Sequence, residues 1–121
     1  MSFPYWRIYW NKNSGSIINF EEKITELNPD RIILIPPYTA FSSRLKENTI
    51  PPSGYCLEGG RVDKNNPESD YLNEGVVLHL FIHFNLGMPY DFISPQIIPF
   101  KVNNDLIRDL EQLTTDLQEN F

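Results

Sequence analysis

The chain has 121 residues, enough for one hydrophobic core and too few for two domains of ordinary size. Hydrophobic residues make up 40% and aromatic residues 13%, which excludes a chain that is disordered throughout. The formal net charge is -6 and basic residues do not cluster, which excludes a nucleic-acid surface because a phosphate backbone would be repelled. A single cysteine, Cys56, excludes an intrachain disulfide. The N-terminus lacks signal-peptide features and the apolar runs are shorter than the roughly 20 residues of a membrane span, so a cytoplasmic protein without a membrane partner is expected.

The first part of the chain predicts a β-hairpin. Residues 6–10 and 16–20 are rich in aromatic and β-branched side chains, which favour strands. Between them, residues 11–15 read Asn-Lys-Asn-Ser-Gly, a composition typical of a turn. The two strands are therefore expected to pair with each other.

The next strand is bounded by two turn signals. Asn28-Pro29-Asp30 predicts a turn, and the compact apolar stretch at 31–35 stops at Pro36-Pro37, because proline cannot continue the pairing of a strand. A further short strand is expected around residues 40–45.

The middle of the chain divides into an irregular segment and a strong strand. Prolines and glycines punctuate residues 46–75 too often for long elements, so this segment is predicted to be a loop-rich insertion. Residues 75–85 form the most hydrophobic strand of the sequence. Their length predicts a central position in a sheet.

The last segment predicts an amphipathic helix at residues 103–121. Asn103-Asn104-Asp105 is a favourable N-cap cluster, and the apolar positions that follow are spaced by four, three and four residues: Leu106, Leu110, Leu113 and Leu117. Many short strands followed by one helix indicate a mainly β fold, a barrel or sandwich with a C-terminal helix. The leucine stripe fits two roles, a cap on the outer face of its own barrel or part of a subunit interface.

The strand at 75–85 has two chemically different faces, because side chains alternate along a strand. One face is wholly apolar and carries Leu78, Leu80, Ile82 and Phe84. The other carries Val77, His79, Phe81, His83 and Asn85, a mixture of imidazole, phenyl and amide groups suited to a partly polar ligand. The second face is the candidate wall of a ligand pocket, although both histidines also fit a purely structural role.

Catalytic and metal sites are poorly supported. His79 and His83 lie four residues apart on a strand, about 13 Å at roughly 3.3 Å per residue, so one ion cannot bridge them. Cys56 lies in the irregular segment, and no serine occupies a nucleophile-elbow motif. We therefore expect a binding protein rather than an enzyme, with no metal and no cofactor.

Three stretches of the sequence together resemble the N-terminal sensor domain of AraC-type transcription regulators. They are Arg-Ile-Tyr-Trp-Asn at 7–11, the run from 27 to 37 that ends in Pro36-Pro37, and His-Leu-Phe-Ile-His-Phe at 79–84. The turn at 28–30 departs from the family's common Pro-Gly-Asp by lacking the glycine. The resemblance extends over nearly the whole chain and is diffuse outside these stretches.

This resemblance implies a cupin-like double-stranded β-helix, a jelly-roll barrel, over residues 1–102 that receives a small effector, often a sugar. Residues 103–121 would then begin a dimerisation segment, and the full-length parent would be a homodimer. DNA would be bound only by a separate helix-turn-helix domain that these 121 residues do not include.

The family's effector contacts correspond to His79 and Phe81, the same face that side-chain alternation selects. His83 shares that face, and three further side chains are candidates to close the pocket: Tyr9, Asn11 and Tyr38. Two alternatives stay open, a free-standing cupin-like enzyme with a bound metal and a protein-interaction module with a filled barrel.

Overall fold

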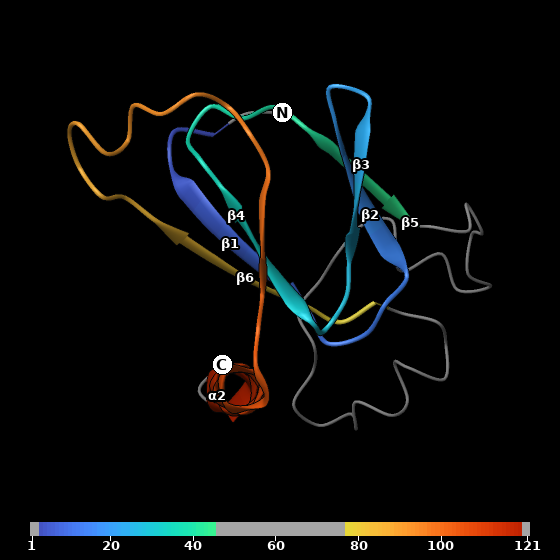
Figure 1. Ribbon diagram of the computed structural model, residues 1–121. Helices are drawn as coiled ribbons and strands as arrows, with labels where there is room; N and C mark the ends of the chain where they lie inside the picture. Colours follow the sequence, from blue (N-terminus) through green and yellow to red (C-terminus); the bar gives the residue numbers. More distant parts are fainter. Residues whose placement is uncertain (1–2, 46–76, 120–121) are drawn as a thin grey trace.

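The computed structural model describes residues 3–45 and 77–119, which form two antiparallel sheets and one helix (Figure 1). The fold is mainly β with a C-terminal helix, as the sequence predicts. The strands are β1 (Trp6–Asn11), β2 (Ser16–Phe20), β3 (Lys23–Leu27), β4 (Arg31–Ile35), β5 (Ser42–Leu45), β6 (His79–Phe84) and β7 (Ile98–Lys101), and the helix is α2 (Asn104–Glu119). The predicted insertion at 46–75 lies outside the described residues.

The strands divide into a four-stranded sheet A, ordered β6-β1-β4-β7, and a three-stranded sheet B, ordered β3-β2-β5. The predicted hairpin between residues 6–10 and 16–20 is wrong, because β1 pairs with β4 and β6 while β2 pairs with β3 and β5. The turn between them carries the chain from one sheet to the other. Turn chemistry signals that a strand ends, but it does not specify the sheet in which the next strand pairs.

A hairpin joins β2 to β3 instead, through Glu21 and Glu22. Both residues have positive φ, 48° and 67°, the backbone geometry that tight hairpins require at their two central positions. Asparagine and glycine usually supply this geometry, so two glutamates gave no sequence signal for the turn.

The strongest predicted strand is present, but among the strands of residues 3–45 and 77–119 it does not have the predicted central position. The described strand β6 is shorter than residues 75–85 and stands at one end of the order of sheet A. Strand β7 was not predicted, because Pro99 lies within it. Proline is tolerated there because β7 is the other outermost of the described strands of sheet A and pairs with none of them on its outer side.

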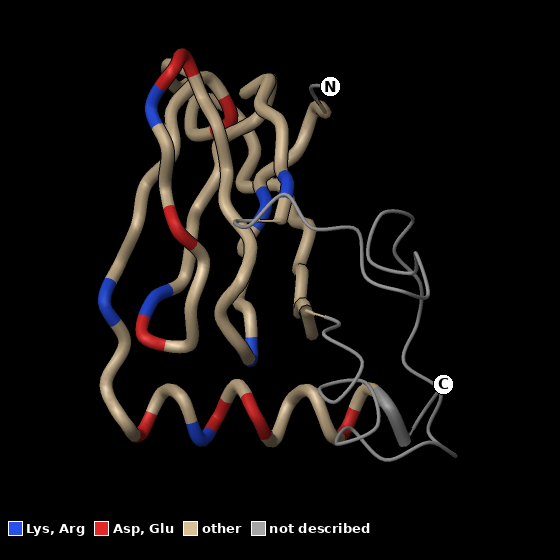
Figure 2. Tube along the Cα trace, turned by 90° about the vertical axis from the view of Figure 1, so that its right-hand side faces the viewer, with Lys and Arg blue, Asp and Glu red and all other residues tan. Residues whose placement is uncertain are grey.

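The helix begins where the sequence predicts, since the Asn103 side-chain oxygen accepts a hydrogen bond of 2.8 Å from the Leu106 amide. Leu110 is buried against Trp10 and Leu80, at one end of the outward face of sheet A. Figure 1 shows α2 end-on below β1 and β6, and Figure 2 shows charged residues along its length. The helix therefore packs on its own sheet. Leu106 and Leu117 each remain 37% exposed.

The main core lies between the two sheets. Ile18 and Leu27 of sheet B are buried against Ile33 and Ile35 of sheet A. Three partly buried side chains complete this layer: Tyr9, Phe41 and Ile97. No helix in the described part of the chain combines the length and the apolar character needed to cross a bilayer.

Candidate functional site

The two faces of β6 have different surroundings. Leu80 is 9% exposed and packs beneath α2, whereas its neighbour Phe81 is 56% exposed. His79 and His83 are exposed on the same side as Phe81, and the ring centroids of Phe81 lie 5.9 Å from His79 and 5.1 Å from His83. The predicted sharing of one face by these three side chains is confirmed, and their role in ligand binding stays a prediction.

Strand β1 adds its own side chains to this face. In the antiparallel register Asn11 pairs with His79, Tyr9 with Phe81 and Arg7 with His83. Paired residues point to the same side of a sheet, so β1 and β6 together present one surface. The structure thus brings five of the six predicted ligand-binding residues together.

His79 is held by a short polar chain. Its Nδ1 lies 2.5 Å from the Asn11 side-chain oxygen, and the Asn11 amide nitrogen donates to the Ser16 hydroxyl at 2.7 Å. Since Asn11 supplies the acceptor, Nδ1 of His79 carries the proton and Nε2 of the neutral ring is a hydrogen-bond acceptor. Although the residue is partly open to solvent, burial of the imidazole lowers the pKa of His79 to about 4, which keeps the ring neutral near pH 7.

A continuous series of ring contacts runs along this surface. Tyr9 meets the His79 ring edge-on at 4.6 Å between centroids, and Tyr5 stacks on His83 at 4.4 Å. With Phe81 between the two histidines, these side chains form what we term the aromatic face: Tyr5, Tyr9, His79, Phe81 and His83. Aromatic and imidazole planes at such spacing offer both apolar stacking area and polar edges.

Arg7 is a site residue that the sequence reasoning missed. It is only 2% exposed, its Nη2 donates to the Thr39 carbonyl oxygen at 3.2 Å, and its Nε is buried without a hydrogen-bond partner. The guanidinium carbon lies 4.6 Å from the centroid of the Phe41 ring, a cation–π contact. Desolvation and the positive charge of Arg7 lower the pKa of His83. Applying side-chain alternation to β1 as well as β6 would have placed Arg7 beside Tyr9.

Tyr38 does not join the other predicted residues. It follows the proline pair in a left-handed conformation with φ of 61°, and its side chain is 57% exposed. Its backbone amide donates to the Phe3 carbonyl oxygen at 2.7 Å. Within the described ranges, no hydrogen bond or ring contact links the Tyr38 side chain to the aromatic face.

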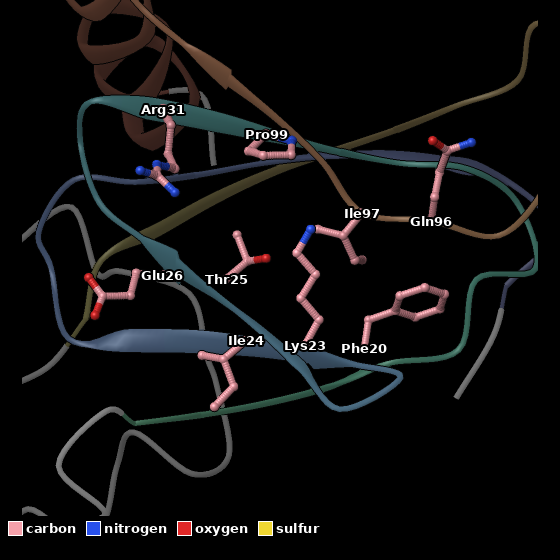
Figure 3. Close-up of a pocket in the computed structure, with 9 residues that line it drawn as sticks. All are labelled: Phe20, Lys23, Ile24, Thr25, Glu26, Arg31, Gln96, Ile97 and Pro99. Atoms are coloured by element: carbon pink, nitrogen blue, oxygen red, sulfur yellow. The ribbon is translucent and has the colours of Figure 1, made fainter.

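A separate groove opens on the other side of the sandwich (Figure 3). It has a volume of about 480 Å³, within the range of small-molecule sites, and lies between β3 and the β4–β7 side of sheet A. Its lining mixes charged, polar and apolar side chains: Phe20, Lys23, Ile24, Thr25, Glu26, Arg31, Gln96, Ile97 and Pro99. None of the predicted site residues lines the groove. No pattern in the sequence predicts it, because its lining residues come from separate stretches of the chain that share no recognisable motif.

Within residues 3–45 and 77–119, no three His, Cys, Asp or Glu side chains come close enough together to hold a metal ion. Comparison with protein-family models, curated proteins and solved structures gives no match.

Proposed function

We propose that this chain is the effector-sensing domain of an AraC-type transcription regulator, a cupin-like barrel that binds a small molecule on the aromatic face. The observation that carries the proposal is the exposure of Phe81 between two imidazoles, on a strand whose opposite face is packed beneath a helix. A large phenyl ring held at 56% exposure contributes little to the core. Its surroundings offer a ready stacking surface.

The chemistry of the face suits a ligand with both apolar and polar parts. An apolar side of the ligand would stack on Phe81, while a ligand hydroxyl would donate to Nε2 of the neutral His79 ring. The buried positive charge of Arg7 favours electron-rich groups nearby. A sugar combines these features, since its ring has an apolar side and its edge carries hydroxyls.

Binding is tested by thermal denaturation of the protein with a panel of sugars and other small metabolites, because a ligand of the native state raises Tm. For any compound that raises Tm, we expect Phe81→Ala to weaken binding at least tenfold, which corresponds to about 1.4 kcal/mol. Phe100→Ala is the matched control, because Phe100 is 47% exposed on β7, away from this face.

Three results would contradict the proposal. The first is a folded protein whose Tm does not respond to any compound, which would favour a protein-interaction module. The second is a ligand whose affinity is unchanged in Phe81→Ala and falls in Lys23→Ala, which would move binding to the groove. The third is stoichiometric zinc, iron or manganese in the purified protein, which would favour the metal-dependent enzyme.

A further inference from the structure

Arg7 carries the only charge on the two strands that form the aromatic face. Strands β1 and β6 contain no Asp, Glu or Lys, and both histidines of β6 are neutral near pH 7 because their pKa values are lowered. Arg7 is 2% exposed, so water hardly reaches its guanidinium group. A positive charge in such a position is costly unless a negative charge or a full set of hydrogen bonds compensates it.

The contacts of Arg7 leave this charge without compensation. Its Nη2 donates to the neutral carbonyl oxygen of Thr39, and its Nε is buried without a hydrogen-bond partner. The guanidinium carbon lies 4.6 Å from the ring centroid of Phe41 and 5.1 Å from that of Phe3. These rings attract a cation but carry no net charge. In the described part of the chain, no carboxylate pairs with Arg7.

A shortage of acidic residues does not explain the missing counter-charge. The chain has 16 acidic and 10 basic residues, and the exposed Arg108 on α2 pairs with Asp105 at 3.2 Å. Such an exposed pair contributes little, whereas a negative charge beside a buried cation interacts strongly because the surrounding dielectric is low. A ligand that brings its own negative charge would supply the compensation that the described residues do not.

The charge of Arg7 acts on the exposed part of the aromatic face. His83 lies opposite Arg7 in the register of β1 and β6, and opposite side chains have Cβ atoms about 4.5–5.5 Å apart. Burial and the positive charge of Arg7 together lower the pKa of His83. Since His83 is exposed, the influence of the buried guanidinium extends to a position that a ligand can reach. An anionic group beside His83 would be stabilised by the same charge.

The amount of charge favours a carboxylate over a phosphate. Arg7 supplies one positive charge, which one carboxylate balances, whereas a phosphate monoester carries between about -1.5 and -2 at pH 7. The ring of Phe81 is 56% exposed, and its centroid lies 5.1 Å from that of His83. A ligand ring stacked on Phe81 would therefore place an attached carboxylate close to His83.

We propose that the ligand of the aromatic face is a ring-bearing organic monoanion, a sugar acid or a similar carboxylic acid. Its ring stacks on Phe81, and its carboxylate lies beside His83 and balances the charge of Arg7. This inference rests on the proposed function, since it names the ligand class of the same face. It narrows that class from sugars in general to acids.

The test uses pairs of compounds that share a ring and differ in one negative charge: glucuronate with glucose, galacturonate with galactose, and benzoate with benzamide. Affinities are measured by NMR titration of the whole chain, followed at the ring signals of its two histidines. We expect at least one acid to bind at least tenfold more tightly than its neutral partner. That acid should also raise the pKa of His83, because a carboxylate opposes the influence of Arg7.

Arg7→Gln tests the source of the preference, since it removes the charge and keeps an amide that can donate to the Thr39 carbonyl oxygen. We expect the preference for the acid to fall below twofold in this variant. Arg31→Gln is the matched control, because it changes the net charge equally and Arg31 lines the groove instead. Far-UV circular dichroism verifies that both variants fold. The pKa of His83 in the unmodified protein decides the question if Arg7→Gln does not fold.

The inference is overturned if no acid binds more tightly than its neutral partner, or if a bound acid leaves the pKa of His83 unchanged. It is also overturned if the preference persists in Arg7→Gln, or if glucose 6-phosphate binds more tightly than glucuronate. A neutral sugar that binds through Phe81 as tightly as its acid would remove this inference alone. The proposed function fails only if no compound, charged or neutral, binds in a way that depends on Phe81.

Discussion

The two faces of β6 come from one stretch of six residues, and they differ in burial. Leu80 packs beneath Trp10 and Leu110, where helix α2 excludes water. One residue further on, Phe81 lies between two imidazoles with more than half of its surface exposed. The difference between Leu80 and Phe81 shows that alternation alone separates a buried face from an exposed face on this strand, so that either face can be altered without altering the other.

The difference between the two faces is tested most directly by making the same substitution at neighbouring positions and comparing the loss of stability. Leu80→Asn removes a buried aliphatic side chain and places an amide under the helix, so we expect a loss of about 3 kcal/mol in the free energy of unfolding. Phe81→Asn exchanges an exposed side chain, and the expected loss is below about 1 kcal/mol. Urea denaturation measures both. Equal losses at the two positions would show that the faces are not separate.

A second prediction concerns helix α2, which covers the Leu80 face of β6. Leu110→Ala should cost about 2 to 3 kcal/mol, because Leu110 is 8% exposed and contributes to the cluster with Trp10 and Leu80. Leu106→Ala removes the same side chain from the same helix at a position that is 37% exposed, and should cost less than about 1 kcal/mol. Urea denaturation measures both losses in the free energy of unfolding. A larger loss for Leu110→Ala than for Leu106→Ala is expected if α2 packs on sheet A through Leu110.

The smallest effect concerns the pH dependence of the aromatic face. The pKa of His79 is lowered to about 4 in the folded protein, below its ordinary value of 6.5. The unfolded chain therefore takes up a proton first as the pH falls. Stability from this group is fully present above pH 6.5 and is lost progressively toward pH 4. We expect the free energy of unfolding to fall between pH 7 and pH 5, as measured by urea denaturation at each pH.

The control for this effect is His79→Gln, which removes the titrating ring from a surrounding set of uncharged groups: Asn11, Tyr9 and Phe81. The pH dependence between pH 7 and pH 5 should become smaller in this variant. His83 contributes in the same direction, since burial and Arg7 lower its pKa too. An unchanged pH dependence in His79→Gln would assign the effect to other groups.

Much of the strand content could be predicted from local sequence signals. β4 occupies the predicted residues, because the turn at Asn28-Pro29-Asp30 and the proline pair Pro36-Pro37 limit the apolar run on both sides. The start of α2 was also predictable, since Asn103 caps it through a local hydrogen bond. The division of β6 into two faces followed from alternation. All three features are determined by residues close together in the chain.

The remaining features depend on contacts between distant residues. Three of them require the register of several strands: the assignment of β1 and β2 to different sheets, the position of β6 at one end of the described strands, and the burial of Arg7 beside Phe41. The groove is lined from separate stretches of the chain in the same way. The exposure of large apolar side chains between β6 and β7 could not be predicted for another reason, because Leu86, Phe92 and Ile93 are residue types that are usually buried.

The pairing of β1 with β6 also constrains how this sequence can change over time. Substitutions at Phe81 or Tyr9 alter one side chain at a time, so the aromatic face can change while the helix stays docked. The gain or loss of a single residue within β6 has a different result, because it shifts every following side chain to the opposite face. A one-residue deletion at position 80 would direct Phe81 toward the helix and Ile82 toward the aromatic face. This strand should therefore accept many exchanges of residue and hardly any change of length.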